Sequence, residues 1–82
     1  MNKVLGWTIH DVGQWIESFG QDYSRYADGF KNDTIDGFRL CSFINDELLI
    51  TYGITNENHR QTILNAIQLM RNNLLRDRRH RH

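Results

Sequence analysis

The chain has 82 residues, of which 39% are hydrophobic and 24% charged, which predicts one small globular domain with little room for a deep internal pocket. No apolar run is long enough to span a membrane, no signal peptide is visible, and the single cysteine excludes an internal disulfide, so we expect an intracellular, cytoplasmic protein. The formal net charge is zero, but residues 1–52 hold eight acidic and four basic side chains while residues 53–82 hold six arginines and two acids, which predicts a negative end and a positive end.

The first predicted helix follows a lead-in, residues 1–6, that we expect to be flexible. Thr8 is a typical N-cap, and Asp11 three residues later completes a short form of the capping box. Apolar residues then recur at helical spacing: Ile9, Val12, Ile16 and Phe19, with Trp15 beside them. Gly20 is expected to end this helix.

A second helix is predicted from about Asp22 to Lys31. It carries one largely aromatic stripe, which consists of Tyr23, Tyr26, Ala27 and Phe30. The stretch NDTIDG, residues 32–37, is rich in cap and turn residues, so the chain should change direction there.

Two more short helices and one long helix complete the predicted fold. The third covers the largely apolar residues 38–43, and Asn45 caps a fourth that ends at Gly53. The last helix should begin at Thr55 and be the longest element, roughly 30 Å over about 20 residues. Its apolar stripe is Ile63, Ala66, Ile67, Met70 and Leu74.

The sequence thus predicts an all-α fold, a five-helix bundle in which a long C-terminal helix lies across four short ones. The absence of proline and the scarcity of strand-like alternation support this fold class. The domain should cover residues 7–75. Residues 76–82, RDRRHRH, have no apolar side chain and are expected to form a basic, disordered tail.

Catalytic and metal-binding chemistry is not favoured by the residues available. The four histidines and Cys41 show no zinc-type spacing. Nothing places Cys41, His59 and an acid together as nucleophile, base and orienting group, and the glycines are scattered singly rather than in a phosphate-binding loop. We predict a protein that is not an enzyme and has no cofactor, metal or small-molecule ligand.

Binding of nucleic acid or anionic lipid through the basic tail is the alternative function. The sequence pI near 6.9 is not typical of a nucleic-acid binder, and Tyr23 and Tyr26 are spaced to share the buried face of a helix. The apolar stripe of the last helix is better explained as core than as a membrane-binding face. Tail-mediated binding should weaken steeply with salt and disappear when residues 76–82 are deleted.

Three stretches, WTIHDVGQWIESFG, YSRYADGFKNDTIDG and NDELLITYGITNENHRQTILNAIQLMR, together resemble a sterile alpha motif (SAM) domain over residues 7–71. The ordered set of markers carries the resemblance: Trp7, Asp11-Val12, Trp15, Tyr26, Phe30, Ile35-Asp36-Gly37, Leu48, Gly53-Ile54, His59-Arg60 and Ile63-Leu64. The resemblance implies a five-helix bundle that binds proteins, often another SAM domain, as an oligomerisation or recruitment module of a signalling or scaffold protein.

Two binding surfaces follow from this resemblance. The acidic mid-loop surface would consist of Asp28, Asp33, Asp36, Asp46 and Glu47, around Phe38 and Leu49 where those reach the surface. The end-helix surface, at the start of the last helix, would consist of Gly53, Ile54, Thr55, Asn56, Asn58, His59 and Arg60. When one domain carries both surfaces, head-to-tail polymers can form.

The end-helix surface of this chain departs from that of strongly polymerising family members. Those members carry lysines where this chain has Asn56, Gln61 and Thr62, and Glu57 adds a negative charge. Arg60 is then the main cation, expected to be exposed and to contact Asp36, Asp46 and Glu47 of another molecule, whereas His59 is expected to cap and pack within its own chain. Both a homotypic and a heterotypic partner stay open.

Overall fold

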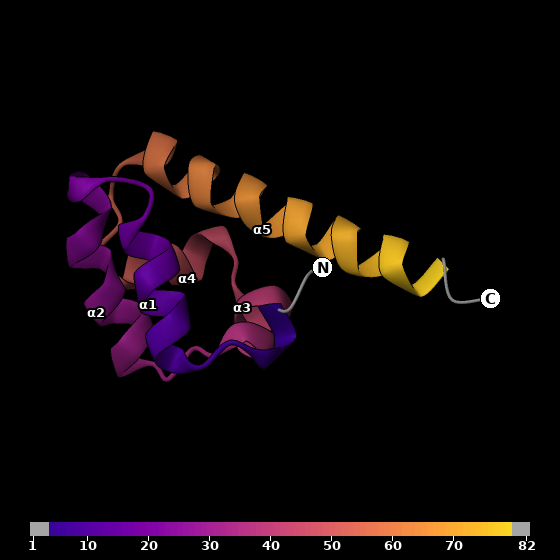
Figure 1. Cartoon of the computed structure of the whole chain (residues 1–82). Coiled ribbons are helices and arrows are strands. Elements are labelled where there is room, and N and C mark those ends of the chain that lie inside the picture. Colours follow the sequence, from indigo (N-terminus) through magenta and orange to yellow (C-terminus); the bar gives the residue numbers. More distant parts are fainter. Residues whose placement is uncertain (1–3, 80–82) are drawn as a thin grey trace.

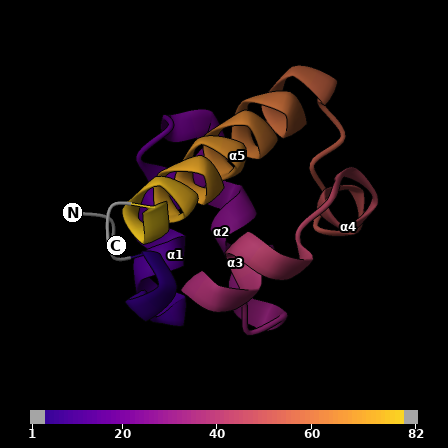
Figure 2. The ribbon, with the colours of Figure 1, turned by 90° about the vertical axis from the view of Figure 1, so that its right-hand side faces the viewer.

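The computed structural model describes residues 4–79, with side chains described through residue 74. Five α-helices and two short 3-10 helices form this part of the chain: η1 (Val4–Gly6), α1 (Ile9–Glu17), η2 (Gln21–Tyr26), α2 (Ala27–Asn32), α3 (Gly37–Phe43), α4 (Asp46–Thr51) and α5 (Glu57–Arg79). The short helices gather under α5, whose second half extends past α3 (Figure 1). Figure 2 places α3 beneath α5, with α1 and α4 on either side. The predicted all-α, five-helix bundle is confirmed.

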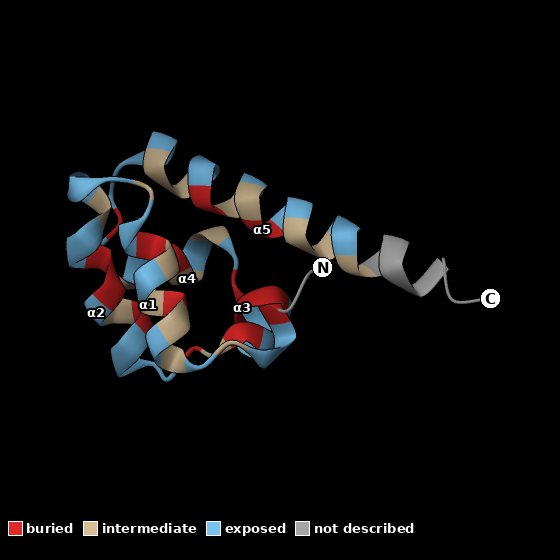
Figure 3. Cartoon of the chain, in the orientation of Figure 1, coloured by how far each residue is buried: buried red, intermediate tan, exposed pale blue. Residues whose placement is uncertain are grey.

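One hydrophobic core holds the bundle together, and every helix contributes to it. The largest fully buried side chains are Phe30, Ile16, Leu40, Leu49, Ile54, Ile63, Ile67, Val4 and Val12. Figure 3 shows the buried positions of α5 on the side that faces the short helices. Burying such side chains stabilises the fold by about 1.5–3 kcal/mol each relative to exposure, which is why α5 stays on the bundle despite its many polar residues.

Side-chain caps define where three of the helices begin, and two of them, Thr8 and Asn45, are the predicted caps. Thr8 and Asp11 form a full capping box at α1, in which each side chain accepts from the other residue's backbone N–H. Asp36 Oδ1 accepts from Arg39 N at 2.9 Å at the start of α3, and Asn45 Oδ1 accepts from Leu48 N at 2.8 Å at the start of α4.

Three helix boundaries differ from the sequence prediction. α1 ends at Glu17 rather than near Gly20, which instead adopts φ 144° and turns the chain into η2. The predicted second helix is divided at Tyr26 into η2 and α2. α5 is capped by Asn56, not Thr55, because the Asn56 carbonyl and side chain accept the N–H groups of Arg60 and His59 respectively.

Both predicted ends of the domain also need correction. Val4–Gly6 is not a flexible lead-in but the helix η1, whose Val4 is fully buried. It is held against α3 because Gly37 N donates to Trp7 O at 3.0 Å and Gly37 has no Cβ to keep Val4 O away. At the other end α5 continues through residues 76–79, where neither proline nor glycine stops it. The rest of the predicted tail, residues 80–82, lies outside the described residues.

Candidate functional site

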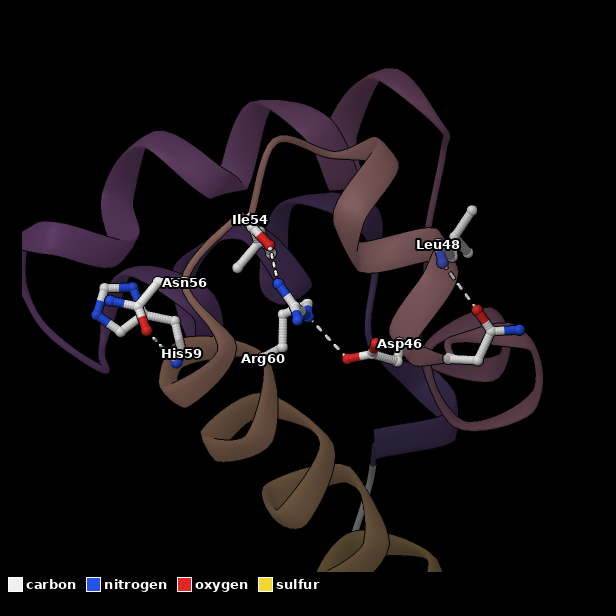
Figure 4. Close-up of polar contacts among 7 residues, drawn as sticks. Asp46, Leu48, Ile54, Asn56, His59 and Arg60 are labelled. Carbon is white, nitrogen blue, oxygen red and sulfur yellow. Dashed lines mark hydrogen bonds and ion pairs between the residues drawn. The ribbon is translucent and has the colours of Figure 1, made fainter.

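Arg60, predicted to be the exposed cation of the end-helix surface, is bonded within its own chain. Its Nε donates to Asp46 Oδ1 at 2.7 Å and its Nη1 donates to the Ile54 carbonyl at 2.9 Å. Figure 4 shows the guanidinium lying between the two acceptors. The Arg60 side chain is only 12% exposed, against 48% for Asp46. The prediction that Arg60 is exposed is therefore wrong, and it joins α5 to α4.

This ion pair should contribute measurably to stability. In a double-mutant cycle, Asp46→Ala and Arg60→Ala should show a coupling of about 1–2 kcal/mol in the free energy of unfolding, measured with urea. The coupling should exceed that of an exposed pair because the Arg60 side chain is largely shielded from water. As a matched control, Glu47→Ala is made at the next residue of α4, which is exposed. A coupling of Arg60 to Glu47 as large as that to Asp46 would contradict a specific pair.

His59 has the capping and packing role that the sequence indicated. Its Nδ1 lies 2.7 Å from the Tyr26 hydroxyl, which belongs to a side chain only 4% exposed. Its ring lies 4.4 Å from the ring of Tyr23, centroid to centroid, at 34°. The imidazole thus satisfies a buried hydroxyl and ties α5 to η2, and part of its surface is still accessible.

The remaining predicted end-helix residues divide into accessible and buried positions. Gly53, Asn56 and Asn58 are exposed. Ile54 is fully buried and cannot touch a partner. Gly53 has φ +89°, a conformation that suits glycine, and this turn leads the chain from α4 into α5. A partner at this end would therefore meet mainly uncharged polar groups.

The five predicted mid-loop acids also fall into two groups. Three have partners in their own chain: Asp33 accepts from the Tyr52 hydroxyl, Asp36 caps α3, and Asp46 pairs with Arg60. Asp28 and Glu47 are exposed, and neither forms an ion pair with another described residue. Burial, followed by the hydrogen bond and charge of Asp33, raises the pKa of the Tyr52 phenol, so this hydroxyl stays protonated and keeps donating.

Two open hollows lie beside these residues. The α2–α4 hollow, about 510 Å³, is lined by Arg25, Asp28, Gly29, Asn32, Asp33, Leu48, Thr51 and Tyr52. The α5-start hollow, about 470 Å³, is lined by Arg25, Tyr26, Tyr52, Gly53, Thr55, Asn56 and His59. Arg25 and Tyr52 line both hollows, and sequence reasoning named neither as a site residue. Arg25 three residues before Asp28 is the one sequence signal that could have indicated a charged patch here.

α3 carries exposed aromatic side chains next to the mid-loop acids. Phe38 is 55% exposed and Phe43 is 58% exposed. Their rings pack edge to face, with 6.2 Å between the ring centroids. Leu49, the other apolar residue expected near the mid-loop surface, is fully buried and belongs to the core. Phe38 is thus available to a partner and Leu49 is not.

No described residues form a cluster of three or more histidine, cysteine or acidic side chains suited to a metal ion. Cys41 is buried, and this burial raises the pKa of its thiol, an effect that Arg71 partly opposes. The Cys41 carbonyl accepts from Arg71 Nε at 2.6 Å, which fastens α3 to α5.

Among the described helices none combines the length and the apolar character that crossing a membrane requires.

Comparison with known proteins gives consistent matches over most of the chain. The family model described as SAM domain (sterile alpha motif) matches residues 4–71. The chain is 32% identical over 66 residues to the mouse bifunctional apoptosis regulator, 33% over 64 residues to the dual specificity protein kinase splA of Dictyostelium discoideum, and 34% over 65 residues to the zebrafish ankyrin repeat and sterile alpha motif domain-containing protein 1B. These matches cover 79%, 78% and 76% of this chain but only 15%, 3% and 5% of the relatives.

Proposed function

The chain belongs to the sterile alpha motif family, and on this premise we propose that it is a non-enzymatic protein–protein interaction module whose partner is another SAM domain. The observation that carries the proposal is the pair of open hollows: one lies at the start of α5, and the other is lined by Asp28, an exposed acid with no ion-pair partner among the described residues. An exposed carboxylate next to open hollows can select a partner by charge without a deep pocket.

The exposure of individual side chains supports a smaller set of partner contacts within the two surfaces. On the mid-loop surface we propose Asp28 and Glu47 as the charged contacts, with Phe38 as the apolar one, since all three are exposed. Asp33, Asp36 and Asp46 would contribute charge while keeping their bonds within the chain. A contact of this kind has an aromatic anchor and a charged rim, the usual composition of a protein interface.

On the end-helix surface we propose Gly53, Asn56 and Asn58 as direct contacts, with the accessible edge of His59. Ile54 and Arg60 would shape this surface from below rather than touch the partner. The N-terminus of the 23-residue α5 adds a partial positive charge that favours an acidic partner.

The relatives support a role in recruitment within an intracellular, cytoplasmic signalling or scaffold protein. By name they are an apoptosis regulator, a protein kinase and an ankyrin repeat protein, and the chain spans less than a sixth of each one's length. A small module that recurs in such different proteins is suited to bringing other domains together.

Titrations followed by NMR test this proposal. The chain labelled with ¹⁵N is mixed with unlabelled copies of itself and with the matching segments of the three relatives, and an unrelated helical domain serves as control. At least one family member should move amide resonances at Asp28 and Glu47, or at Asn56 and Asn58, in a saturable way. If no family member moves either set more than the control does, the proposed function is wrong.

A further inference from the structure

The only arginine in the first turns of α5 is already bonded within its own chain. Arg60 donates to Asp46 and to a backbone carbonyl, and its side chain is largely shielded from water. Figure 4 shows this side chain reaching away from Asn56 and His59. Glu57, in the first turn of the same helix, is exposed and negative. A full positive charge for an acidic partner at this end must therefore come from another element of the fold.

Arg25, at the end of η2, brings such a charge to the start of α5. It lines the α5-start hollow, whose other lining residues are Tyr26, Tyr52, Gly53, Thr55, Asn56 and His59, none of them acidic. The α2–α4 hollow, which Arg25 also lines, contains the acids Asp28 and Asp33. The α5-start hollow is thus the one of the two in which no lining acid offsets the charge of Arg25.

The Arg25 guanidinium is available to a partner and rests on a fixed support. The residue is exposed, and no described carboxylate lies within ion-pairing distance of it. Its guanidinium carbon lies 5.7 Å from the centroid of the Tyr26 ring, a distance at which a cation is attracted to the ring. Tyr26 is itself only 4% exposed, and its hydroxyl is bonded to His59 Nδ1. Arg25 is therefore held beside the hollow with its planar fork still able to bind a carboxylate.

Uncharged donors line the same hollow and complete a site for a carboxylate. The Thr55 hydroxyl and the Asn56 amide can each donate a hydrogen bond there. Asn56 Oδ1 already accepts from His59 N, which leaves the NH₂ group of the amide for a partner. The hollow, about 470 Å³, is large enough for an acidic side chain.

Resting on the proposed function, we infer that Arg25 determines the specificity of the end-helix surface, and that the partner places an aspartate or glutamate side chain in the α5-start hollow. Arg25 thereby supplies the charge that Arg60 does not. The helix terminus and the neutral donors orient the carboxylate, and Arg25 separates an acidic partner from a neutral or basic one.

Binding measurements on Arg25 variants test the inference. The ligand is the family segment, from the copies of this chain and the three relatives, that moves the amide resonances of Asn56 and Asn58 in the titrations. By calorimetry, Arg25→Gln should raise its dissociation constant about fivefold or more, whereas Arg25→Lys, which keeps the charge, should stay within about threefold of wild type. Lys31→Gln is the matched control, because it removes the same charge from an exposed residue that lines neither hollow, and it should stay within about twofold.

Replacing each aspartate and glutamate of the ligand by its amide, one at a time, tests the chemistry of the partner. One replacement should weaken binding to the wild type about fivefold and have no further effect on binding to the Arg25→Gln variant, because the pair is then already lost.

Three results would overturn the inference and leave the proposed function intact. They are equal effects of Arg25→Gln and Lys31→Gln, a ligand in which no acid is coupled to Arg25, and family segments that move only Asp28 and Glu47. If no family segment binds at all, the proposed function is wrong and the inference is wrong with it.

Discussion

Replacing Gly37 with alanine should lower the free energy of unfolding by about 3 kcal/mol or more. The added methyl group would overlap the Val4 carbonyl oxygen and lie 2.8 Å from the Val4 carbonyl carbon and 3.0 Å from Trp7 Cβ. These are backbone and Cβ atoms that cannot rotate away, so η1 must leave α3. The loss would include the burial of Val4 and the hydrogen bond from Gly37 N to Trp7 O.

Urea unfolding followed by circular dichroism measures this effect, and the same η1–α3 contact supplies the control. A methyl group added at Gly6 would have no neighbour within 4 Å. Gly6→Ala should therefore change the free energy of unfolding by no more than about 0.5 kcal/mol. If the two variants unfold at the same urea concentration, the close approach at Gly37 does not exist in solution.

The second large loss of stability is expected from a substitution at Val4, which lies in η1 on the other side of the contact with α3. Val4→Asp should cost about 3 kcal/mol or more, because it places a carboxylate at a fully buried position and removes the apolar contacts of the valine. Thermal and urea unfolding should both show the loss. The comparison also tests whether the first described turn of the chain belongs to the folded domain.

Leu5→Asp is the matched control, since Leu5 follows Val4 on the same 3-10 turn and is 52% exposed. Its substitution should change stability by less than about 1 kcal/mol. A Val4→Asp variant as stable as Leu5→Asp would mean that η1 is detached in solution and that residues 1–6 are a flexible lead-in after all.

Several helix starts could be predicted because their signals are local. Thr8, Asp36 and Asn45 each accept from a backbone N–H three residues ahead, so the cap and its target lie in one short stretch of sequence. Helix ends were less predictable. At the division between η2 and α2, the Tyr26 hydroxyl bonds to His59 Nδ1, which lies 33 positions later and carries no local sequence signal.

On the end-helix surface, the exposure of Arg60 was predicted wrongly because a residue distant in sequence determines it. Arg60 looks exposed when only the helix is considered, but Asp46 lies 14 positions earlier and draws the guanidinium across to α4. Val4 looked like part of a flexible lead-in for the same reason, since what buries it is a glycine 33 positions later that permits close approach. The hollows around Arg25 and Tyr52 likewise exist only once α2, α4 and α5 are assembled.

The fastening of α3 has a mechanical consequence. Its first residue, Gly37, holds η1 through the Trp7 carbonyl, and its last turn holds α5 through the Cys41 carbonyl and Arg71. A tensile force applied between residue 4 and the far end of α5 would therefore pass through this seven-residue helix. Under this force the hydrogen bonds from Gly37 to Trp7 and from Arg71 to Cys41 would break first. The helices α1 and α2 would unfold later, because they lie outside the line of force.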